Sequence, residues 1–220
     1  MKKLLLFLVL FSFTATAIAQ GAQKPFYNDI QGFKKEDSLQ KPPSNAILFV
    51  GSSSFRMWND VQQAFPEHTI INRGFGGSSL PHVIQYADDI IFPYNPKQIV
   101  IYAGENDLTE SDTISAQTVY KRFQHLFHLI REKSPKTPVV YVSIKPSPSR
   151  AHLMPKMVEA NGLIQAFLKK QKRAKFVNVY PLMLNSDGKP MQDIFLADNL
   201  HMNAKGYAIW KKALKPHLKK

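Results

Sequence analysis

Ala46-Ile47-Leu48-Phe49-Val50 is an apolar run that stops at Gly51, and three serines follow it at positions 52–54. A short run of this kind, bounded by a turn residue, is typical of a strand that is buried on both faces of a parallel sheet. A glycine at the end of a strand permits a tight turn, and a helix can begin at the serines. We therefore expect a strand, a turn and a helix start here, with a hydroxyl group beside free backbone N–H groups.

The same alternation continues along the chain. Four further apolar runs lie at 68–72, 98–103, 138–143 and 175–179. Between and after these runs, apolar residues recur at helical spacing, and Asn203 is suited to cap the last helix; the residues concerned are Phe123, Leu126, Phe127, Ile130, Leu163, Phe167, Leu168, Ile209, Trp210 and Leu214. Strands that alternate with helices predict an α/β fold with a parallel sheet covered on both faces. Ligands of such open sheets bind beyond the carboxyl ends of the strands.

The first residues predict export. Lys2 and Lys3 precede an apolar run at 4–13, and Ala17-Ile18-Ala19 then matches the small-residue pattern of a signal-peptide cleavage site. The run is too short for a transmembrane anchor, which needs about 20 apolar residues. We expect a signal peptide at 1–19, cleavage near Ala19, a periplasmic or secreted protein, and an irregular N-terminal lead-in at 20–45.

Composition limits the class of protein. The chain has 220 residues, no cysteine and 44% hydrophobic residues, so we expect one domain that is stabilised by a packed core without disulfides or thiolate metal sites. The net charge of +13 can favour anionic partners. Many lysines, however, form short pairs such as Lys169-Lys170 and Lys211-Lys212, which are more typical of solvated helix ends.

Polar and glycine-rich segments follow the second and third predicted strands. Residues 74–77 are Gly-Phe-Gly-Gly, which lets backbone N–H groups approach a ligand closely. They match neither the dinucleotide fingerprint nor the nucleotide P-loop. After the third strand comes Gly104-Glu105-Asn106-Asp107. An asparagine fixed at a strand end can direct a side-chain N–H at an oxyanion without titrating.

Asp198-Asn199-Leu200-His201 lies just before the last predicted helix. A histidine acts as a general base when one ring nitrogen is held by an acceptor and the other is free. An aspartate three positions earlier on a tight loop can supply that acceptor. Each segment taken singly is as well explained by a turn or a cap, but together they supply a nucleophile, oxyanion donors, a base and its orienting acid.

At these residues the chain resembles the SGNH hydrolases, also called the GDSL esterase/lipase family. The four family blocks match Ser53, Gly77, Asn106 and His201, and the resemblance extends from about Ala46 to the last helix. It implies an SGNH hydrolase domain at 46–220 with a flavodoxin-like, three-layer α/β/α sandwich of five parallel strands. The first block departs from the family pattern, because Ser52 stands where the family has aspartate.

The resemblance implies a catalytic triad of Ser53, His201 and Asp198, and an oxyanion hole formed by the backbone N–H groups of Ser53 and Gly77 and by the Asn106 side chain. Ser52 and Ser54 remain alternatives for the nucleophile, and Gly76 for Gly77. The implied activity is hydrolysis of carboxylic esters through an acyl-enzyme.

Short loops without an apolar lid favour small acyl groups, such as acetyl esters on carbohydrate. The alternatives are lysophospholipase or thioesterase action on longer chains, and a non-catalytic basic protein that binds glycan or nucleic acid. No cofactor or metal is expected, although His125 and His128 lie three residues apart on a predicted helix. The expected partner is a small-molecule or glycan ester, without nucleic acid; the sequence leaves the oligomeric state open. Tyr102, Tyr141 and Tyr180 lie near strand ends, where packing is their expected role.

Overall fold

The computed structural model describes residues 23–220, and the expected signal peptide at 1–19 lies outside them. A single five-stranded sheet has the order β2-β1-β3-β4-β5, and every neighbouring pair is parallel. The strands are β1 (Ile47–Gly51), β2 (Ile70–Gly74), β3 (Gln98–Tyr102), β4 (Val139–Val142) and β5 (Ala174–Val177). This strand order is that of the flavodoxin-like fold, so the predicted architecture is confirmed, with strand bounds within two residues of those expected.

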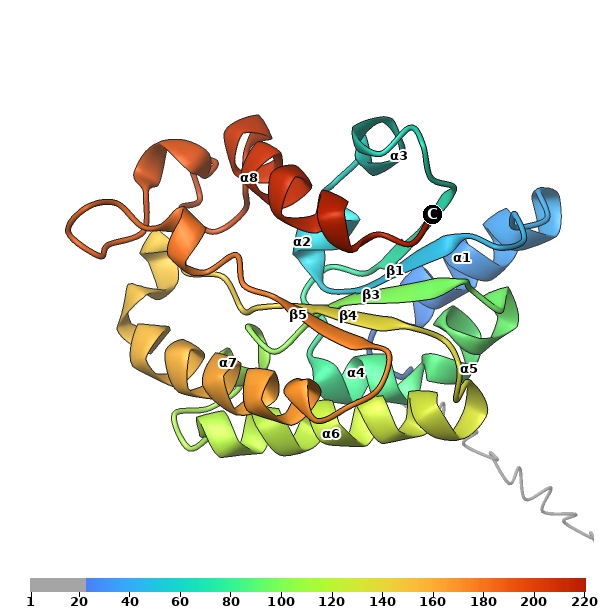
Figure 1. Ribbon diagram of the computed structural model, residues 1–220, viewed down its shortest axis with the longest axis horizontal. Coiled ribbons are helices and arrows are strands. Elements are labelled where there is room, and N and C mark those ends of the chain that lie inside the picture. Colours follow the sequence, from blue (N-terminus) through green and yellow to red (C-terminus); the bar gives the residue numbers. More distant parts are fainter. Residues whose placement is uncertain (1–22) are drawn as a thin grey trace, which may run out of the picture.

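Helices cover both faces of the sheet (Figure 1). On one face lie α2 (Ser53–Arg56), α3 (Val61–Ala64) and α8 (Ala204–Leu214). On the other lie α4 (Leu80–Gln85), α5 (Ala87–Ile90), α6 (Ala116–Lys133) and α7 (Met154–Lys169). Short 3₁₀ helices complete the described part at Phe92–Tyr94, Asp107–Thr109, Pro148–Leu153, Pro181–Met183, Gln192–Ile194 and Lys215–His217.

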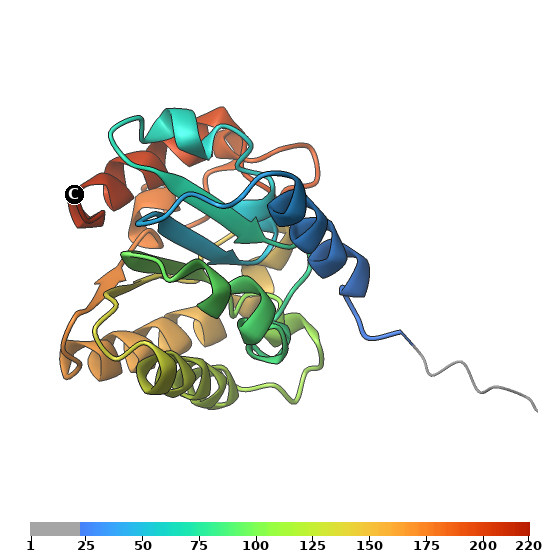
Figure 2. The same ribbon diagram turned by 90° about the vertical axis from the view of Figure 1, so that its right-hand side faces the viewer.

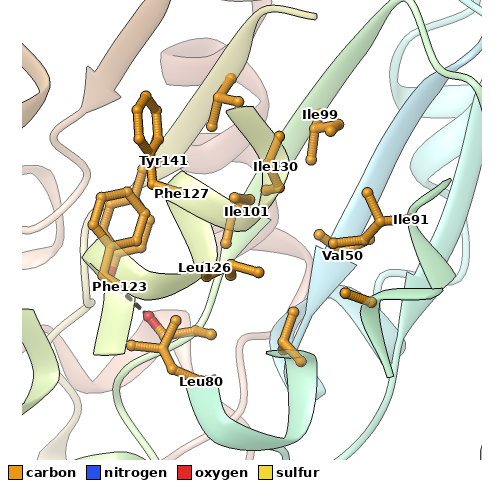
Figure 3. Packing of buried hydrophobic residues seen from close by; sticks show 14 of the residues in the cluster. Val50, Leu80, Ile91, Ile99, Ile101, Phe123, Leu126, Phe127, Ile130 and Tyr141 are labelled. Carbon is orange, nitrogen blue, oxygen red and sulfur yellow. Dashed lines mark hydrogen bonds between the residues drawn. The ribbon is translucent and has the colours of Figure 1, made fainter. Parts of the chain in front are cut away.

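Successive side chains along the strands alternate between the two faces of the sheet and form two hydrophobic cores, one on each face. Val50, Ile99 and Ile101 point to the α4–α7 face, where they pack with Phe123 and Phe127 of α6 (Figure 3). Their strand neighbours, such as Phe49, Val100 and Tyr102, point to the opposite face and pack with Trp58 and Trp210. Because successive side chains of a strand face opposite ways, the central strands of a sheet covered on both sides need apolar side chains on both faces.

The lead-in at 20–45 is not irregular as expected. It contains α1 (Tyr27–Leu39), which lies beside the edge strand β2 (Figure 2). Phe26, Ile30 and Phe33 lie at helical spacing and pack against the core, and Ile30 is fully buried. Arg73 of β2 forms an ion pair with Asp37 of this helix. The prediction was wrong because three apolar side chains among many lysines and polar residues give a weak periodic pattern.

Among residues 23–220, no helix combines the length and apolar composition needed to cross a bilayer.

Gly51 is required by the close approach of two strands at the site end of the sheet. Its φ is +136°, and a Cβ built on it would lie 1.8 Å from the carbonyl oxygen of Tyr102. That oxygen accepts a hydrogen bond from the backbone N–H of Ser52, at 2.9 Å. The turn that begins the serine segment therefore depends on the missing side chain.

We expect Gly51→Ala to lower the free energy of unfolding by at least about 3 kcal/mol, because it combines backbone strain with a clash against a hydrogen-bonded carbonyl. Chemical denaturation measures the change. Gly32→Ala is the control: it lies in α1 with nothing within 4 Å of the added Cβ, so it is expected to stabilise the protein by about 0.5–1 kcal/mol. Equal stabilities for the two variants would contradict the role assigned to Gly51.

Candidate active site

Ser53 is the first residue of helix α2, directly after strand β1. Ser52 occupies the N-cap position with an extended backbone, and its side chain makes no capping hydrogen bond. An N–H group in the first turn has no carbonyl of its own helix to bind, and within residues 23–220 the Ser53 amide has no other acceptor. Ser52 and Ser54 are buried, whereas Ser53 is half-buried and reaches the surface. The structure thus separates the three serines by exposure.

Asp198 and His201 lie on the loop before α8. Oδ1 of Asp198 accepts hydrogen bonds from the backbone N–H groups of Leu200 and His201, both at 2.9 Å, which closes the loop on itself. Asn199 supports this turn with a positive φ of 56°, which asparagine tolerates better than most residues. The side chain of Asn203 accepts hydrogen bonds from the amides of Lys205 and Gly206, so it caps α8 as predicted.

Three side chains form one hydrogen-bonded chain across the site. Nδ1 of His201 lies 2.6 Å from Oδ2 of Asp198, and Nε2 lies 3.0 Å from Oγ of Ser53. Ionised carboxylate only accepts, so Nδ1 carries the proton toward Asp198 and Nε2 is free to accept one from the hydroxyl group. Ser53 and His201 are 148 residues apart in the sequence. The structure brings together the three residues that the sequence singled out.

The carboxyl group of Asp198 is held in its charged form. Partial burial opposes this, yet the pKa is lowered from 3.8 to about 2 because the carboxylate accepts hydrogen bonds from the His201 ring and from the amides of His201 and Leu200. Asp198 therefore stays anionic at every pH at which the imidazole could act as a base. An anion in this place fixes the ring orientation and stabilises a positive charge on it.

The glycine-rich loop after β2 presents a second free amide. Gly77, not Gly76, has a positive φ, of 79°. Within the described residues the Gly77 N–H has no acceptor. The loop is fastened to the end of β1, since the Phe75 amide and the Ser78 hydroxyl both donate to the carbonyl oxygen of Gly51. The amide of Gly76 has no acceptor in the described residues either, so the two glycines differ in backbone conformation and Gly76 stays an alternative donor.

Asn106 directs its amide group toward the same place. Nδ2 donates to Oγ of Ser52 at 2.7 Å and to the carbonyl oxygen of Ser78 at 2.9 Å. The next residue, Asp107, is fully buried and accepts hydrogen bonds from the Leu80 amide and from Arg122. The loop that carries Asn106 is thereby tied to the start of α4. An asparagine N–H, two backbone N–H groups, a hydroxyl and an imidazole are suited to acyl transfer.

Sequence reasoning missed three charged residues behind the site. Glu105 and Lys145 are almost fully buried and form an ion pair, with Nζ 3.2 Å from Oε2. Arg150 lies 3.0 Å from Oε1 of the same carboxylate and also donates to Oδ1 of Asn106. Glu105 precedes Asn106 in the sequence, and Lys145 and Arg150 follow the strand at 138–143. Their position after predicted strands was the only feature of the sequence that could have indicated a role at the site.

The tyrosines near the strand ends have packing roles. The hydroxyl group of Tyr102 donates to Glu105, and that of Tyr141 donates to the carbonyl oxygen of Ala103. Both rings are fully buried. Tyr180 is also almost fully buried and packs against the larger core.

One surface hollow lies away from the triad, and another lies beside it. One of about 630 Å³, lined by Gln98, Lys175 and His217 among others, lies at the amino ends of the strands, away from the triad. Another of about 510 Å³ is lined by Met57, Leu196 and Met202 among others, which are close neighbours of Ser53 and His201. Within residues 23–220, no group of three potential metal-binding side chains was found.

A comparison with protein families gives a match over most of the chain. Residues 43–209 match the model of the GDSL-like lipase/acylhydrolase family. The chain belongs to this family.

Relatives of the GDSL-like chain include the alpha1 subunits of platelet-activating factor acetylhydrolase IB. The Pongo abelii protein is 27% identical over 178 residues, covering 78% of this chain and 74% of the relative. The Homo sapiens protein is 26% identical over 177 residues, covering 78% and 73%.

Solved structures share the fold. A GDSL-like lipase from Bacteroides thetaiotaomicron has a TM-score of 0.70 at 21% identity and covers 86% of this chain and 96% of its own. A variant of an acetyl-xylooligosaccharide esterase from Geobacillus has a TM-score of 0.64 at 12% identity, covering 80% and 96%. Its membership of the GDSL-like lipase/acylhydrolase family makes the protein an ester hydrolase of the acylhydrolase type.

The lowered pKa of Asp198 predicts a pH-dependent contribution to stability. The folded pKa of about 2 lies below the ordinary value of 3.8. The stabilisation is therefore complete above the ordinary value and is lost as the pH falls through the folded one. We expect the wild-type protein to be more stable than Asp198→Asn at pH 5, and this difference to shrink toward pH 2. Urea denaturation at each pH measures it; a constant difference would contradict the assignment.

Proposed function

We propose that the protein is an exported serine esterase in which Ser53 is the nucleophile, His201 the general base and Asp198 its orienting acid. The observation that supports this most is the 3.0 Å contact between Oγ of Ser53 and Nε2 of His201, continued by the 2.6 Å contact to Asp198. Both distances lie in the range expected of a nucleophile and base within hydrogen-bond reach.

In the first half of the reaction, Oγ of Ser53 forms a bond with the ester carbonyl carbon while its proton passes to Nε2 of His201. The carbonyl electron pair moves onto oxygen and gives a tetrahedral oxyanion. When the oxyanion collapses, the bond to the alcohol oxygen breaks, and His201 returns the proton to the leaving alcohol. An acyl-Ser53 intermediate remains, and Asp198 has stabilised the imidazolium throughout.

In the second half, water takes the place of the alcohol. Nε2 of His201 accepts a proton from the water as its oxygen bonds to the acyl carbon. The second oxyanion collapses, the bond to Oγ breaks, and the proton passes to Ser53. The products are a carboxylic acid and the original enzyme.

The oxyanion is stabilised by the N–H groups of Ser53 and Gly77 and by Nδ2 of Asn106. The two backbone donors have no competing acceptor within residues 23–220. In the free protein the two hydrogens of Asn106 Nδ2 bind Oγ of Ser52 and the carbonyl oxygen of Ser78, and we expect the oxyanion to become a further acceptor of the hydrogen that faces Ser52. The two backbone donors are fixed and free before the reaction, so they stabilise the developing charge without reorganisation.

The substrate class we propose is a short acyl ester, acetyl above all, on a small molecule or a carbohydrate. The names of the relatives point the same way, since they include an acetylhydrolase and an acetyl-xylooligosaccharide esterase. The hollow beside Met57 and Leu196 also has a mixed lining, with polar Asn59, Asp60 and Lys211 at its walls. That mixture suits the alcohol part of a polar ester better than a long alkyl chain.

Export is supported by the pattern of the first 19 residues: lysines, an apolar run and Ala17-Ile18-Ala19. A periplasmic or extracellular esterase would meet its substrate outside the cytoplasm.

Removing the nucleophile or an oxyanion donor tests the mechanism. We expect Ser53→Ala to have no measurable activity on p-nitrophenyl acetate, and Asn106→Ala to lose a factor on the order of 10²–10³ in kcat while remaining folded. Asn185→Ala is the control, because its side chain, on a separate loop, likewise holds the local backbone in place, by accepting hydrogen bonds from the Asp187 and Lys189 amides. Wild-type turnover in Asn106→Ala would overturn the oxyanion assignment.

A series of p-nitrophenyl esters with increasing acyl length tests the substrate class. Acetyl and propionyl esters should give the highest kcat/KM, because polar Asn59, Asp60 and Lys211 share the lining of the hollow with Met57 and Leu196, so a long chain gains less by burial there than in a wholly apolar groove. Acetylated sugars extend the series to natural alcohols. A kcat/KM that rises toward octanoyl or longer chains would favour lysophospholipase or thioesterase action.

A further inference from the structure

Four side chains form a buried cluster behind the site, which we name the Glu105 cluster: Tyr102, Glu105, Lys145 and Arg150. The side chains of Glu105 and Lys145 are 5% and 1% exposed, and that of Arg150 is 17% exposed. The Glu105 carboxylate accepts a hydrogen bond from the Tyr102 hydroxyl group and forms ion pairs with Lys145 and Arg150. The acyl-transfer steps described above use none of these groups.

The cluster holds the loop that carries Asp198 and His201. Nζ of Lys145 donates to the carbonyl oxygen of Leu200 at 2.8 Å, and the Ser149 amide donates to that of Asn199 at 3.0 Å. Both carbonyls lie between the proposed acid and base. The segment after β4 therefore fastens the catalytic loop at two consecutive residues.

The same cluster determines how the amide group of Asn106 is turned. Nη1 of Arg150 lies 3.0 Å from Oδ1 of Asn106 and can only donate. A donor-only partner fixes the oxygen on its own side and so presents Nδ2 to Ser52 and Ser78. A cation on the carbonyl oxygen also polarises the amide, which makes its N–H groups stronger donors.

Stability alone is a weak explanation for such a cluster. Burying a charged group is unfavourable, and buried ion pairs often stabilise a fold no better than apolar side chains of similar size. Burial would raise the pKa of Glu105, but Lys145 and Arg150 hold it below its ordinary value, so the carboxylate is charged. This anion lies one residue from Asn106 and is joined through Lys145 to the loop of His201.

We propose that Arg150 is a positioning residue of the oxyanion site, which fixes and polarises the Asn106 amide, and that the Glu105–Lys145 pair joins this residue to the catalytic loop as one rigid unit. The inference rests on the proposed acyl-transfer function. It predicts that Arg150 acts on turnover and leaves substrate affinity largely unchanged, because it touches the oxyanion donor and not the substrate.

The test compares Arg150→Ala and Arg150→Lys with wild type on p-nitrophenyl acetate. We expect kcat to fall about 10- to 100-fold in Arg150→Ala with KM within about twofold. Arg150→Lys should recover part of the loss, because it keeps the charge but not the geometry of the guanidinium group. Added guanidinium ion, well below denaturing concentrations, should raise kcat of Arg150→Ala by filling the vacated position. A purely structural role would not give such rescue.

Arg131→Ala is the matched control. Its guanidinium group donates to three backbone carbonyls at the far end of the sheet, so its loss perturbs the fold without reaching the site. Its kcat should stay near wild type and should not respond to guanidinium. If Arg150→Ala does not fold, Arg150→Lys alone decides, and a kcat equal to wild type would overturn the proposal.

A fluorophosphonate distinguishes failure of this proposal from failure of the proposed function. Wild type should be labelled on Ser53, and Arg150→Ala should be labelled about 10- to 100-fold more slowly, since phosphonylation builds charge in the same oxyanion site. Equal labelling rates in the two proteins would refute the role of Arg150 while leaving the esterase intact. A wild-type protein that is not labelled on Ser53 would refute the function itself.

Discussion

The hydrogen bond between Ser53 and His201 is the contact on which the proposed function depends, and the order of the strands in the sheet makes it possible. Strand β1 lies between β2 and β3, so the loops after these three strands meet at one edge and bring together Ser53, Gly77 and Asn106. His201 arrives from the other end of the sequence, 148 residues away, on a loop closed by the Asp198 carboxylate. The order of the strands in the sheet, rather than proximity in the sequence, brings the residues of the site together.

Local chemistry made much of this predictable. The central strands β1, β3 and β4 are short, mostly apolar runs that are buried throughout, because a strand covered on both faces has no solvent side. Gly51 indicates the turn, because only glycine fits against the Tyr102 carbonyl group. Asp198 and His201 are three residues apart, so their pairing needs one tight loop and no knowledge of the rest of the fold. The sequence left three serines open, and the burial of Ser52 and Ser54 separates them.

The Glu105 cluster was beyond the sequence for a physical reason. Its charged groups neutralise one another only through contacts between segments 40 residues or more apart, as between Lys145 and Glu105. Contacts of this kind produce no periodic pattern in the sequence. A lysine after a strand is ordinarily a surface residue, and here it is buried. Helix α1 was not predicted because its few apolar residues lie among many charged ones. In both cases tertiary contacts outweigh what local composition favours.

The most direct test of the account is a crystal structure of the protein after reaction with a small fluorophosphonate, whose tetrahedral phosphorus resembles the acyl-transfer intermediate. We predict a phosphorus–oxygen bond to Oγ of Ser53, with one phosphoryl oxygen within hydrogen-bond distance of the Ser53 and Gly77 amides and of Nδ2 of Asn106. An adduct on Ser52 or Ser54, or a phosphoryl oxygen turned away from these three donors, would contradict it.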